Sequence, residues 1–224
     1  SHNARHISIQ AGEMQGEKFI EFGHRQAYHD LIDPQSGFRT GTQLLFFNTA
    51  IQYREDELKI EQFDLMTVNS YNPVSPFKIP LSWGFNLGWQ QEALEQGGKF
   101  SEHEQHGVAN LKVQMGYSYA DQAREHLCYA QLQNHIQAGK ALDEGWRVAM
   151  GPTLGCQNIW SDKVNSLIQV ELPYWEDSHQ WQLKLNTEWQ YVLNQQNAIR
   201  LGWEYQHQHG KDWNKASLGY ITFF

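Results

Sequence analysis

The feature that most constrains this chain is an alternation of apolar and polar residues that recurs in segment after segment. Residues 81–89 place Leu, Trp, Phe, Leu and Trp at the odd positions and Ser, Gly, Asn and Gly at the even ones. Residues 181–191 and 199–205 repeat this pattern. A period of two puts the apolar side chains on one face of an extended strand, whereas a helix requires a period of about 3.6. The sequence therefore predicts a protein built from β-strands.

The pattern predicts about twelve strands, most of them long enough to cross a bilayer when tilted, which takes about ten residues. The phase of the pattern breaks at Ile60, Phe63 and Leu65, which predicts a bulge in the fourth strand. Pro152 predicts a bulge or break in the eighth, because proline cannot donate to a ladder. We expect the strands near residues 4–12, 17–28, 42–54, 57–69, 80–93, 107–119, 125–138, 145–157, 163–174, 180–193, 197–207 and 213–224.

The last predicted strand carries a barrel-closure signal. Residues 217–224 read Ser-Leu-Gly-Tyr-Ile-Thr-Phe-Phe, so Gly219 follows a polar residue by two positions, and Tyr220 and Phe224 share one face. This ending resembles the carboxy-terminal signal of outer-membrane β-barrels, although Thr222 stands where an apolar residue is usual. In such barrels the last strand pairs with the first, so that no open edge remains.

The alternation leaves open which face meets water. A soluble barrel or sandwich, such as a lipocalin-like fold, alternates in the same way with its apolar face in the core. Here the apolar faces end in aromatic residues, and the polar faces mix Gly, Asn, Gln and charges of both signs. These features suit a lipid band between aromatic girdles and a crowded polar lumen. We therefore predict that residues 1–224 form a single all-β domain, a transmembrane antiparallel up-and-down β-barrel of about 12 strands in the outer membrane of a Gram-negative bacterium.

Composition agrees with this interpretation. The 224 residues carry a net charge of -8 and have a mean hydropathy of -0.65. A barrel meets lipid only at every second position of a strand, so its mean hydropathy stays polar. The acidic balance argues against nucleic acid as a partner. The partners we expect are outer-membrane lipid and the barrel-assembly machinery, and we expect a signal sequence to have been removed or to lie upstream.

Cys128 and Cys156 are the only cysteines. A turn near residues 141–143 would bring them almost opposite each other, on the apolar face of neighbouring strands. The oxidising periplasm permits a disulfide between them. Two unpaired buried thiols are the alternative, because a register slip of one residue would separate them.

Charged residues recur on the predicted lumen face of consecutive strands. Opposite charges on neighbouring strands can pair. We expect a network that fills the lumen and rigidifies it, and the alternative is a selective polar pathway. The predicted network consists of Arg147, Glu171, Lys184, Glu188, Arg200 and Glu204.

The sequence shows no motif for catalysis, a metal or a cofactor. The eleven histidines include no recognisable ligand spacing. A lipolytic barrel would need a Ser, a His and an orienting polar residue at the membrane rim. Ser8 or Ser82 with His6 or His24 is conceivable, but no motif supports either pairing. We expect no catalytic residue, no metal and no cofactor, and no enzymatic activity from this chain by itself.

Three segments together resemble a known family. They are residues 25–34 (Arg-Gln-Ala-Tyr-His-Asp-Leu-Ile-Asp-Pro) with the following Gly37, Gly41 and Gln43, residues 61–65 (Glu-Gln-Phe-Asp-Leu) and residues 80–83 (Pro-Leu-Ser-Trp). They are similar to the carboxy-terminal region of proteobacterial proteins with an Lnb-like (lipoprotein N-acyltransferase-like) periplasmic domain. The resemblance implies that this chain is the barrel half. It places the catalytic cysteine of the family in the upstream domain, so no catalytic residue carries over.

The resemblance implies an upstream periplasmic domain as a partner, which this barrel would anchor and present. The best-matching block falls in a long connection that we expect on the periplasmic side, and it supplies candidate docking residues. The first alternative is a small outer-membrane channel or transporter, and the second is an outer-membrane lipid-modifying enzyme. The candidate docking residues are Tyr28, His29, Asp30, Asp33 and Pro34.

Overall fold

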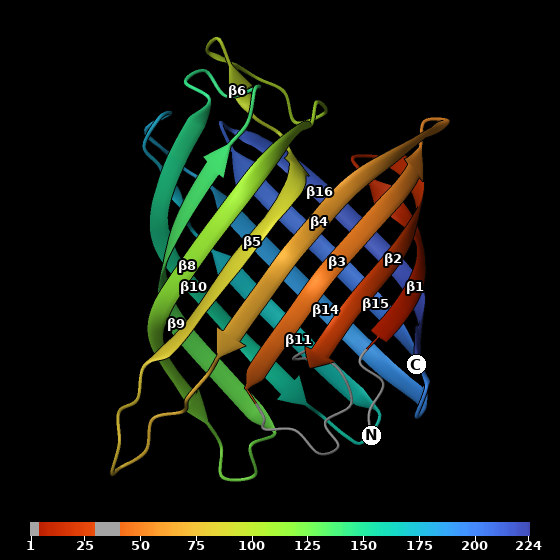
Figure 1. The fold of residues 1–224 in the computed structure, drawn as a ribbon, viewed down its shortest axis with the longest axis vertical. Helices are drawn as coiled ribbons and strands as arrows, with labels where there is room; N and C mark the ends of the chain where they lie inside the picture. The colour runs from red at the N-terminus through yellow and green to blue at the C-terminus, as the bar shows by residue number, and fades with distance from the viewer. Residues whose placement is uncertain (1–4, 30–40) are drawn as a thin grey trace.

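The computed structural model describes residues 5–29 and 41–224, and in this part of the chain twelve antiparallel strands close into a barrel (Figure 1). The barrel strands are β1 (Arg5–Met14), β2 (Glu17–His29), β3 (Thr42–Arg54), β4 (Glu57–Ser70), β5 (Ser82–Glu92), β8 (His106–Ala120), β9 (His126–Ala138), β10 (Trp146–Ile159), β11 (Val164–Glu171), β14 (Leu183–Asn194), β15 (Asn197–Gln208) and β16 (Lys211–Phe223). The prediction of an up-and-down transmembrane barrel of about twelve strands is confirmed.

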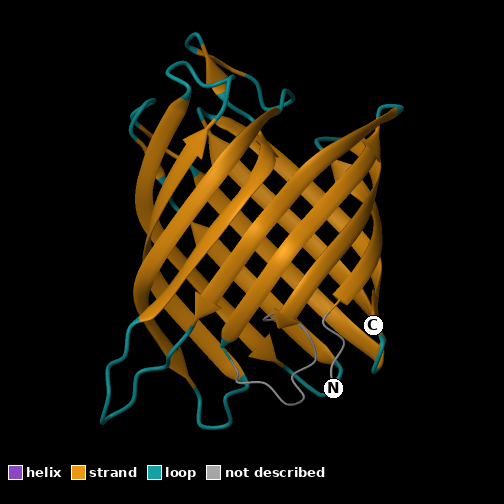
Figure 2. Cartoon of the chain, in the orientation of Figure 1, coloured by secondary structure: helices purple, strands orange, loops and turns teal. Residues whose placement is uncertain are grey.

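Four short strands lie in the loops: β6 (Glu95–Gln96), β7 (Lys99–Phe100), β12 (Tyr174–Trp175) and β13 (Gln180–Trp181). We call the end of the barrel where β1 begins and β16 ends the terminal end, and the opposite one the distal end. Loops and turns extend from both ends (Figure 2). Among the described residues, no helix is long and apolar enough to span a membrane.

The first and last strands close the barrel. β1 pairs with β16 from His6 opposite Phe223 to Met14 opposite Lys215. The alternation of β16 turns Tyr220 outward, and Phe224, just beyond the strand, is also exposed. This pairing leaves no unpaired edge at the ends of the chain.

The bulge predicted for β4 is present, whereas the bulge or break predicted at Pro152 is not, because β10 runs unbroken from Trp146 to Ile159 and keeps its register with β9. The pairing of β3 with β4 shifts register after Ala50, and the pairing of β4 with β5 shifts between Asp64 and Met66. In β10, the ladder changes partner at Pro152, from β11 to β12. A Cβ atom on Gly151 would lie 1.8 Å from the carbonyl oxygen of Leu172, so only glycine permits this close approach.

The prediction of one strand over residues 163–174 is wrong in its last part. β11 ends at Glu171, and the chain then forms the β12–β13 hairpin before β14 begins. The partner change at Pro152 explains the break, because the edge of β10 that pairs with β11 pairs with β12 of this hairpin on the other side of Pro152.

The barrel turns its apolar side chains outward. A soluble protein would bury this face, so its exposure as a continuous surface identifies the lipid-facing side and excludes the soluble alternative. The inward positions of the same strands are mostly polar. Exposed aliphatic residues of this belt include Ile7, Ile9, Leu87, Leu111, Val113, Met115, Leu132, Ile136, Leu154, Ile168, Leu201 and Leu218.

Aromatic residues flank the aliphatic belt at both ends of the barrel. Trp and Tyr favour the two membrane–water interfaces, where an apolar ring can keep a polar group in water. The two rows therefore mark the levels of the headgroups. Exposed members are Trp83, Tyr119, Tyr191 and Tyr220 towards the terminal end, and Tyr53, Trp146 and Trp181 towards the distal end.

Replacing Leu111 by arginine should reduce the free energy of unfolding by about 2–4 kcal/mol, the cost of a basic side chain on the lipid face near the bilayer midplane. Leu111 pairs with Leu87 and Ile136, both in the aliphatic belt. Asn186→Arg is the control, because Asn186 lines the lumen opposite Glu204. Urea unfolding in lipid vesicles measures both, and equal losses would contradict an outward, lipid-facing Leu111.

Candidate functional site

The lumen is the candidate site, and a buried carboxylate organises its distal half. Glu92, the last residue of β5, is 3% exposed. Its Oε1 atom lies 3.4 Å from Nη2 of Arg147 and 3.3 Å from Nζ of Lys184. β14, which carries Lys184, lies five strands away from β5 in a barrel of twelve. The ion pair therefore joins walls that are nearly opposite each other, and it crosses the lumen.

Side chains from β8 and β9 add hydrogen bonds around this charge cluster. Nε of Arg147 donates to Oε1 of Gln137 at 2.7 Å, and Gln137 donates to Glu92 and, at 2.8 Å, to Oδ1 of Asn110. The same Asn110 oxygen lies 2.7 Å from Nε2 of His135. These buried hydrogen bonds restrict the network to one arrangement, because a rearrangement would leave further polar groups unpaired.

Trp175, from the β12–β13 hairpin, packs into the same cluster and is 2% exposed. The guanidinium carbon of Arg147 lies 3.6 Å from the centre of its ring, and the His135 ring lies at 5.0 Å. Its indole N–H donates to Oε1 of Gln182 at 2.8 Å. We call Glu92, Gln137, Arg147, Trp175 and Lys184 the distal plug.

The loop over residues 93–105, which contains β6 and β7, reaches across the distal mouth. The ring of Phe100 stacks on His209 with a centroid distance of 4.8 Å. Nζ of Lys211 donates to the carbonyl of Phe100 at 3.2 Å and pairs with Glu102 at 3.2 Å. A backbone hydrogen bond, and then Lys211, lower the pKa of this carboxyl. Lys211 begins β16, five strands from β5 in the other direction, so the loop covers the mouth.

Below the plug lies a polar cavity of about 360 Å³. Carboxamides and charged groups make up most of its wall, and Asp64 accepts hydrogen bonds from Asn48 at 3.2 Å and Asn86 at 3.1 Å. The charged groups on the wall have both signs, so the cavity has no strong bias for an anion or a cation. They are Glu21, Arg25, Asp64, Lys112, Glu171, Glu188, Arg200, Glu204 and Lys215.

At the terminal end, Tyr71 folds from the β4–β5 connection into the barrel. Its ring stacks on Tyr129 with a centroid distance of 4.4 Å, and both pack against Leu127. Burial raises the pKa of the Tyr71 phenol far above its ordinary value. Gly41, at φ +89°, accepts the Tyr71 amide, and a Cβ there would lie 2.9 Å from the Tyr71 carbonyl oxygen. Apolar and aromatic side chains therefore narrow the lumen at the terminal end as well.

The six charged residues predicted for the lumen belong to several separate contacts. Arg147 and Lys184 meet through Glu92, which the sequence analysis did not single out. Glu171 pairs with Lys112 at 3.9 Å. Of the other three, Arg200 donates to Gln190, and Glu188 and Glu204 line the cavity.

Part of this arrangement had a signal in the sequence. Glu92 continues the even-numbered polar face that starts at Ser82, so its inward direction follows from the alternation. Trp175 had no such signal, because tryptophan in a membrane barrel is expected at the lipid interface.

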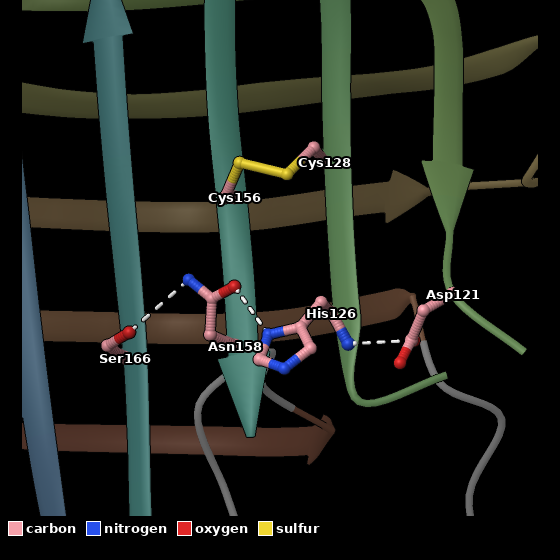
Figure 3. The surroundings of a disulfide bond; sticks show 6 residues. All are labelled: Asp121, His126, Cys128, Cys156, Asn158 and Ser166. Carbon is pink, nitrogen blue, oxygen red and sulfur yellow. Dashed lines mark hydrogen bonds between the residues drawn. A yellow bond between two sulfur atoms is a disulfide. The ribbon is translucent and has the colours of Figure 1, made fainter. Parts of the chain in front are cut away.

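The structure joins Cys128 and Cys156 by a disulfide on the outward face (Figure 3). The two residues are direct partners in the pairing of β9 with β10. The bridge therefore links neighbouring strands that already share a ladder, near the terminal end of the barrel.

A small polar cluster lies close to this disulfide, at the terminal rim (Figure 3). Oδ1 of Asn158 lies 2.9 Å from Nδ1 of His126, and Nδ2 of Asn158 donates to Ser166 at 3.4 Å. The amide of Asn158, rather than the imidazole, contacts the Ser166 hydroxyl, so this cluster lacks the base contact that a serine nucleophile needs. Asp121 accepts the His126 backbone amide at 3.0 Å. Asp121, Glu125 and His126 also bring potential metal-ligand atoms within 4.8 Å of one another.

The serines considered from the sequence lie at buried positions of the barrel. Ser82 and Ser118 share a buried hydroxyl contact of 2.8 Å. Ser8 and His6 are buried at inward positions of β1.

The candidate docking block falls mostly outside the described residues. Tyr28 and His29 end β2, whereas Asp30, Asp33 and Pro34 lie outside the part that the structure describes. β2 ends and β3 begins at the terminal end.

A protein-family model described as Domain of unknown function (DUF7840) matches residues 1–223. The chain belongs to the DUF7840 family. No curated protein matches it.

Solved structures similar to this DUF7840 chain are membrane barrels of low sequence identity. The KdgM porin has a TM-score of 0.49 and 9% identity, with 98% of this chain and 99% of that one covered. Omp33 of Acinetobacter baumannii has a TM-score of 0.44 and 8% identity, with 100% and 99% covered. An anion-selective porin from Comamonas acidovorans has a TM-score of 0.43 and 13% identity, with 93% and 77% covered.

Proposed function

We propose that this chain is an anchor in the bacterial outer membrane that holds a periplasmic domain of the Lnb-like type at the membrane surface, and that its lumen is closed. The observation that carries the proposal is the distal plug. Glu92 joins Arg147 and Lys184 across the lumen, and the loop over residues 93–105 covers the mouth above it. A barrel filled in this way contributes attachment to the membrane rather than passage through it.

The direction of the barrel supports the same role. In outer-membrane barrels with an even number of strands, both termini lie on the periplasmic side. The terminal end would then face the periplasm, and a domain joined ahead of β1 would lie beside it.

Single-channel recording in planar bilayers tests the closed lumen. We expect the folded protein to give no conductance steps, because the charge cluster and the covering loop would obstruct the passage of ions. Folding is checked by a shift in gel mobility on boiling. Steady conductance from the unaltered barrel would contradict the anchor with a closed lumen. It would favour a small-solute channel, the second candidate, which the polar cavity of about 360 Å³ supports.

Association with a separately purified Lnb-like domain tests the anchoring role. We expect the folded barrel to retain this domain in a pull-down, and the combined replacement of Asp30, Asp33 and Pro34 by alanine to weaken retention. The gel mobility shift of the variant should be unchanged, which separates loss of docking from loss of folding. Equal retention by the unaltered and altered barrels would contradict docking through this block.

A further inference from the structure

We propose that the tip of the β4–β5 connection is a lipid-embedded foot, which inserts into the membrane leaflet next to the terminal end. The foot consists of residues 75–81, Ser-Pro-Phe-Lys-Ile-Pro-Leu. The connection leaves the wall of the barrel at the terminal end and extends beyond it (Figure 1). Its proposed occupant is the lipid of that leaflet.

The foot exposes apolar side chains more fully than the barrel wall does. Phe77 is 93% exposed and Ile79 is 75% exposed, the two highest values among the large hydrophobic residues that the structure describes. Side chains of this size in water carry an unfavourable hydration free energy, which burial would remove. An exposed apolar tip of this kind marks a surface that contacts lipid or protein.

Continuity with the lipid-facing wall favours lipid. Phe77, Ile79 and Leu81 alternate in the same phase as Trp83, which belongs to the outward face of β5 and to the aromatic row at this end. The backbone of the connection also runs beside β8, because the amide of Val74 donates to the carbonyl of Ser118 at 2.8 Å. The neighbouring outward residues of β8, Tyr117 and Tyr119, are 53% and 66% exposed. The foot therefore extends an interface that already meets lipid.

The foot has a fixed shape without a partner. Ser75 and Lys78 exchange backbone hydrogen bonds of 2.8 and 3.3 Å, and the Ser75 hydroxyl accepts the Lys78 amide at 3.1 Å. Nδ2 of Asn72 donates to the carbonyl of Leu81 at 2.9 Å and so closes the base of the connection. Backbone groups paired in this way lower the cost of entering a lipid environment.

The single charge of the foot also favours lipid as its occupant. Lys78 is the only charged residue of the foot. A lysine between two apolar side chains can extend its ammonium group to lipid phosphates while the chain below it stays in apolar surroundings. The foot thus combines an apolar tip with one cation, which matches the boundary between acyl chains and phosphate headgroups.

Site-directed fluorescence tests the foot. The two cysteines of the chain are joined in a disulfide, so Phe77→Cys adds a single thiol for an environment-sensitive dye. Gln195→Cys is the matched control, because Gln195 is exposed in the turn between β14 and β15 at the same end. Each labelled barrel is placed in vesicles of phosphatidylcholine and phosphatidylglycerol, with and without brominated acyl chains, after its gel mobility shift on boiling has been checked.

We expect brominated lipid to quench the dye at position 77 several-fold more than the dye at position 195, with a blue-shifted emission at 77. Adding Lys78→Glu to the Phe77→Cys barrel should reduce this quenching, because a carboxylate would repel the phosphates. Equal quenching at the two positions would overturn the proposal. A dye at 77 that stays in water in vesicles, and is shielded only after a periplasmic protein is added, would overturn it in favour of a protein partner.

Discussion

Replacing Glu92 by alanine is expected to lower the free energy of unfolding by about 3–5 kcal/mol, the usual cost of removing one member of a buried ion pair. Arg147 is 4% exposed, and it would lose its counter-charge together with Lys184. Gln137 would also lose an acceptor for its amide. The large effect therefore comes from cations left buried without their counter-charge, rather than from the lost contact alone.

Urea unfolding of the barrel in vesicles, followed by tryptophan fluorescence, measures this loss. Glu92→Gln keeps the shape of the side chain and removes only its charge. We therefore expect this variant to lose most of the free energy of unfolding that Glu92→Ala loses. Glu102→Ala removes a carboxylate from the loop over the mouth, where solvent screens its pair with Lys211, and should cause no measurable loss. A Glu92→Ala barrel as stable as the unaltered protein would show that the cluster does not hold the opposite walls together.

Replacing Trp175 by alanine is expected to cost about 3–5 kcal/mol, as for other large buried aromatic residues. The change removes the surface on which the Arg147 guanidinium stacks and leaves Oε1 of Gln182 without its donor. Because the ring fills space beside the ion cluster, its loss should also admit ions, and we expect conductance steps where the unaltered barrel is silent.

Trp175→Phe separates packing from hydrogen bonding in this prediction. A phenyl ring keeps most of the volume but cannot donate to Gln182, so we expect a smaller loss of about 1–3 kcal/mol and a silent lumen. Unfolding and planar-bilayer recording on the two variants give both measurements. If neither variant gives conductance steps and both keep the free energy of unfolding of the unaltered protein, Trp175 does not close the barrel.

The strands could be predicted because their signal is local. In residues 81–89, the direction of every side chain follows from its neighbours one and two positions away, and the structure confirms that Trp83 and Leu87 face lipid. The prediction failed where a non-local partner decided the outcome. The end of β11 at Glu171 depends on the edge that β10 offers at Pro152, and these residues lie on different strands.

In the candidate site, the direction of the side chains could also be predicted from the sequence, whereas their contacts could not. The inward direction of Arg147, Lys184 and Glu92 follows from the alternation. Their contact does not, because Lys184 has Glu171 as its neighbour in the ladder and yet pairs with Glu92 across the lumen. Pairing between neighbouring strands would predict Glu171, and not Glu92, as the partner of Lys184.

The sequence by itself determined the strands, their faces and the closure of β1 against β16, because a pleated strand sends alternate side chains to opposite sides whatever its distant surroundings are. Only the tertiary structure decided which inward groups meet. Closing twelve strands fixes the diameter of the lumen and the tilt of its walls. Those two quantities bring Glu92 within 3.3 Å of Lys184 and fold Tyr71 and Trp175 into the interior, and no local pattern contains them.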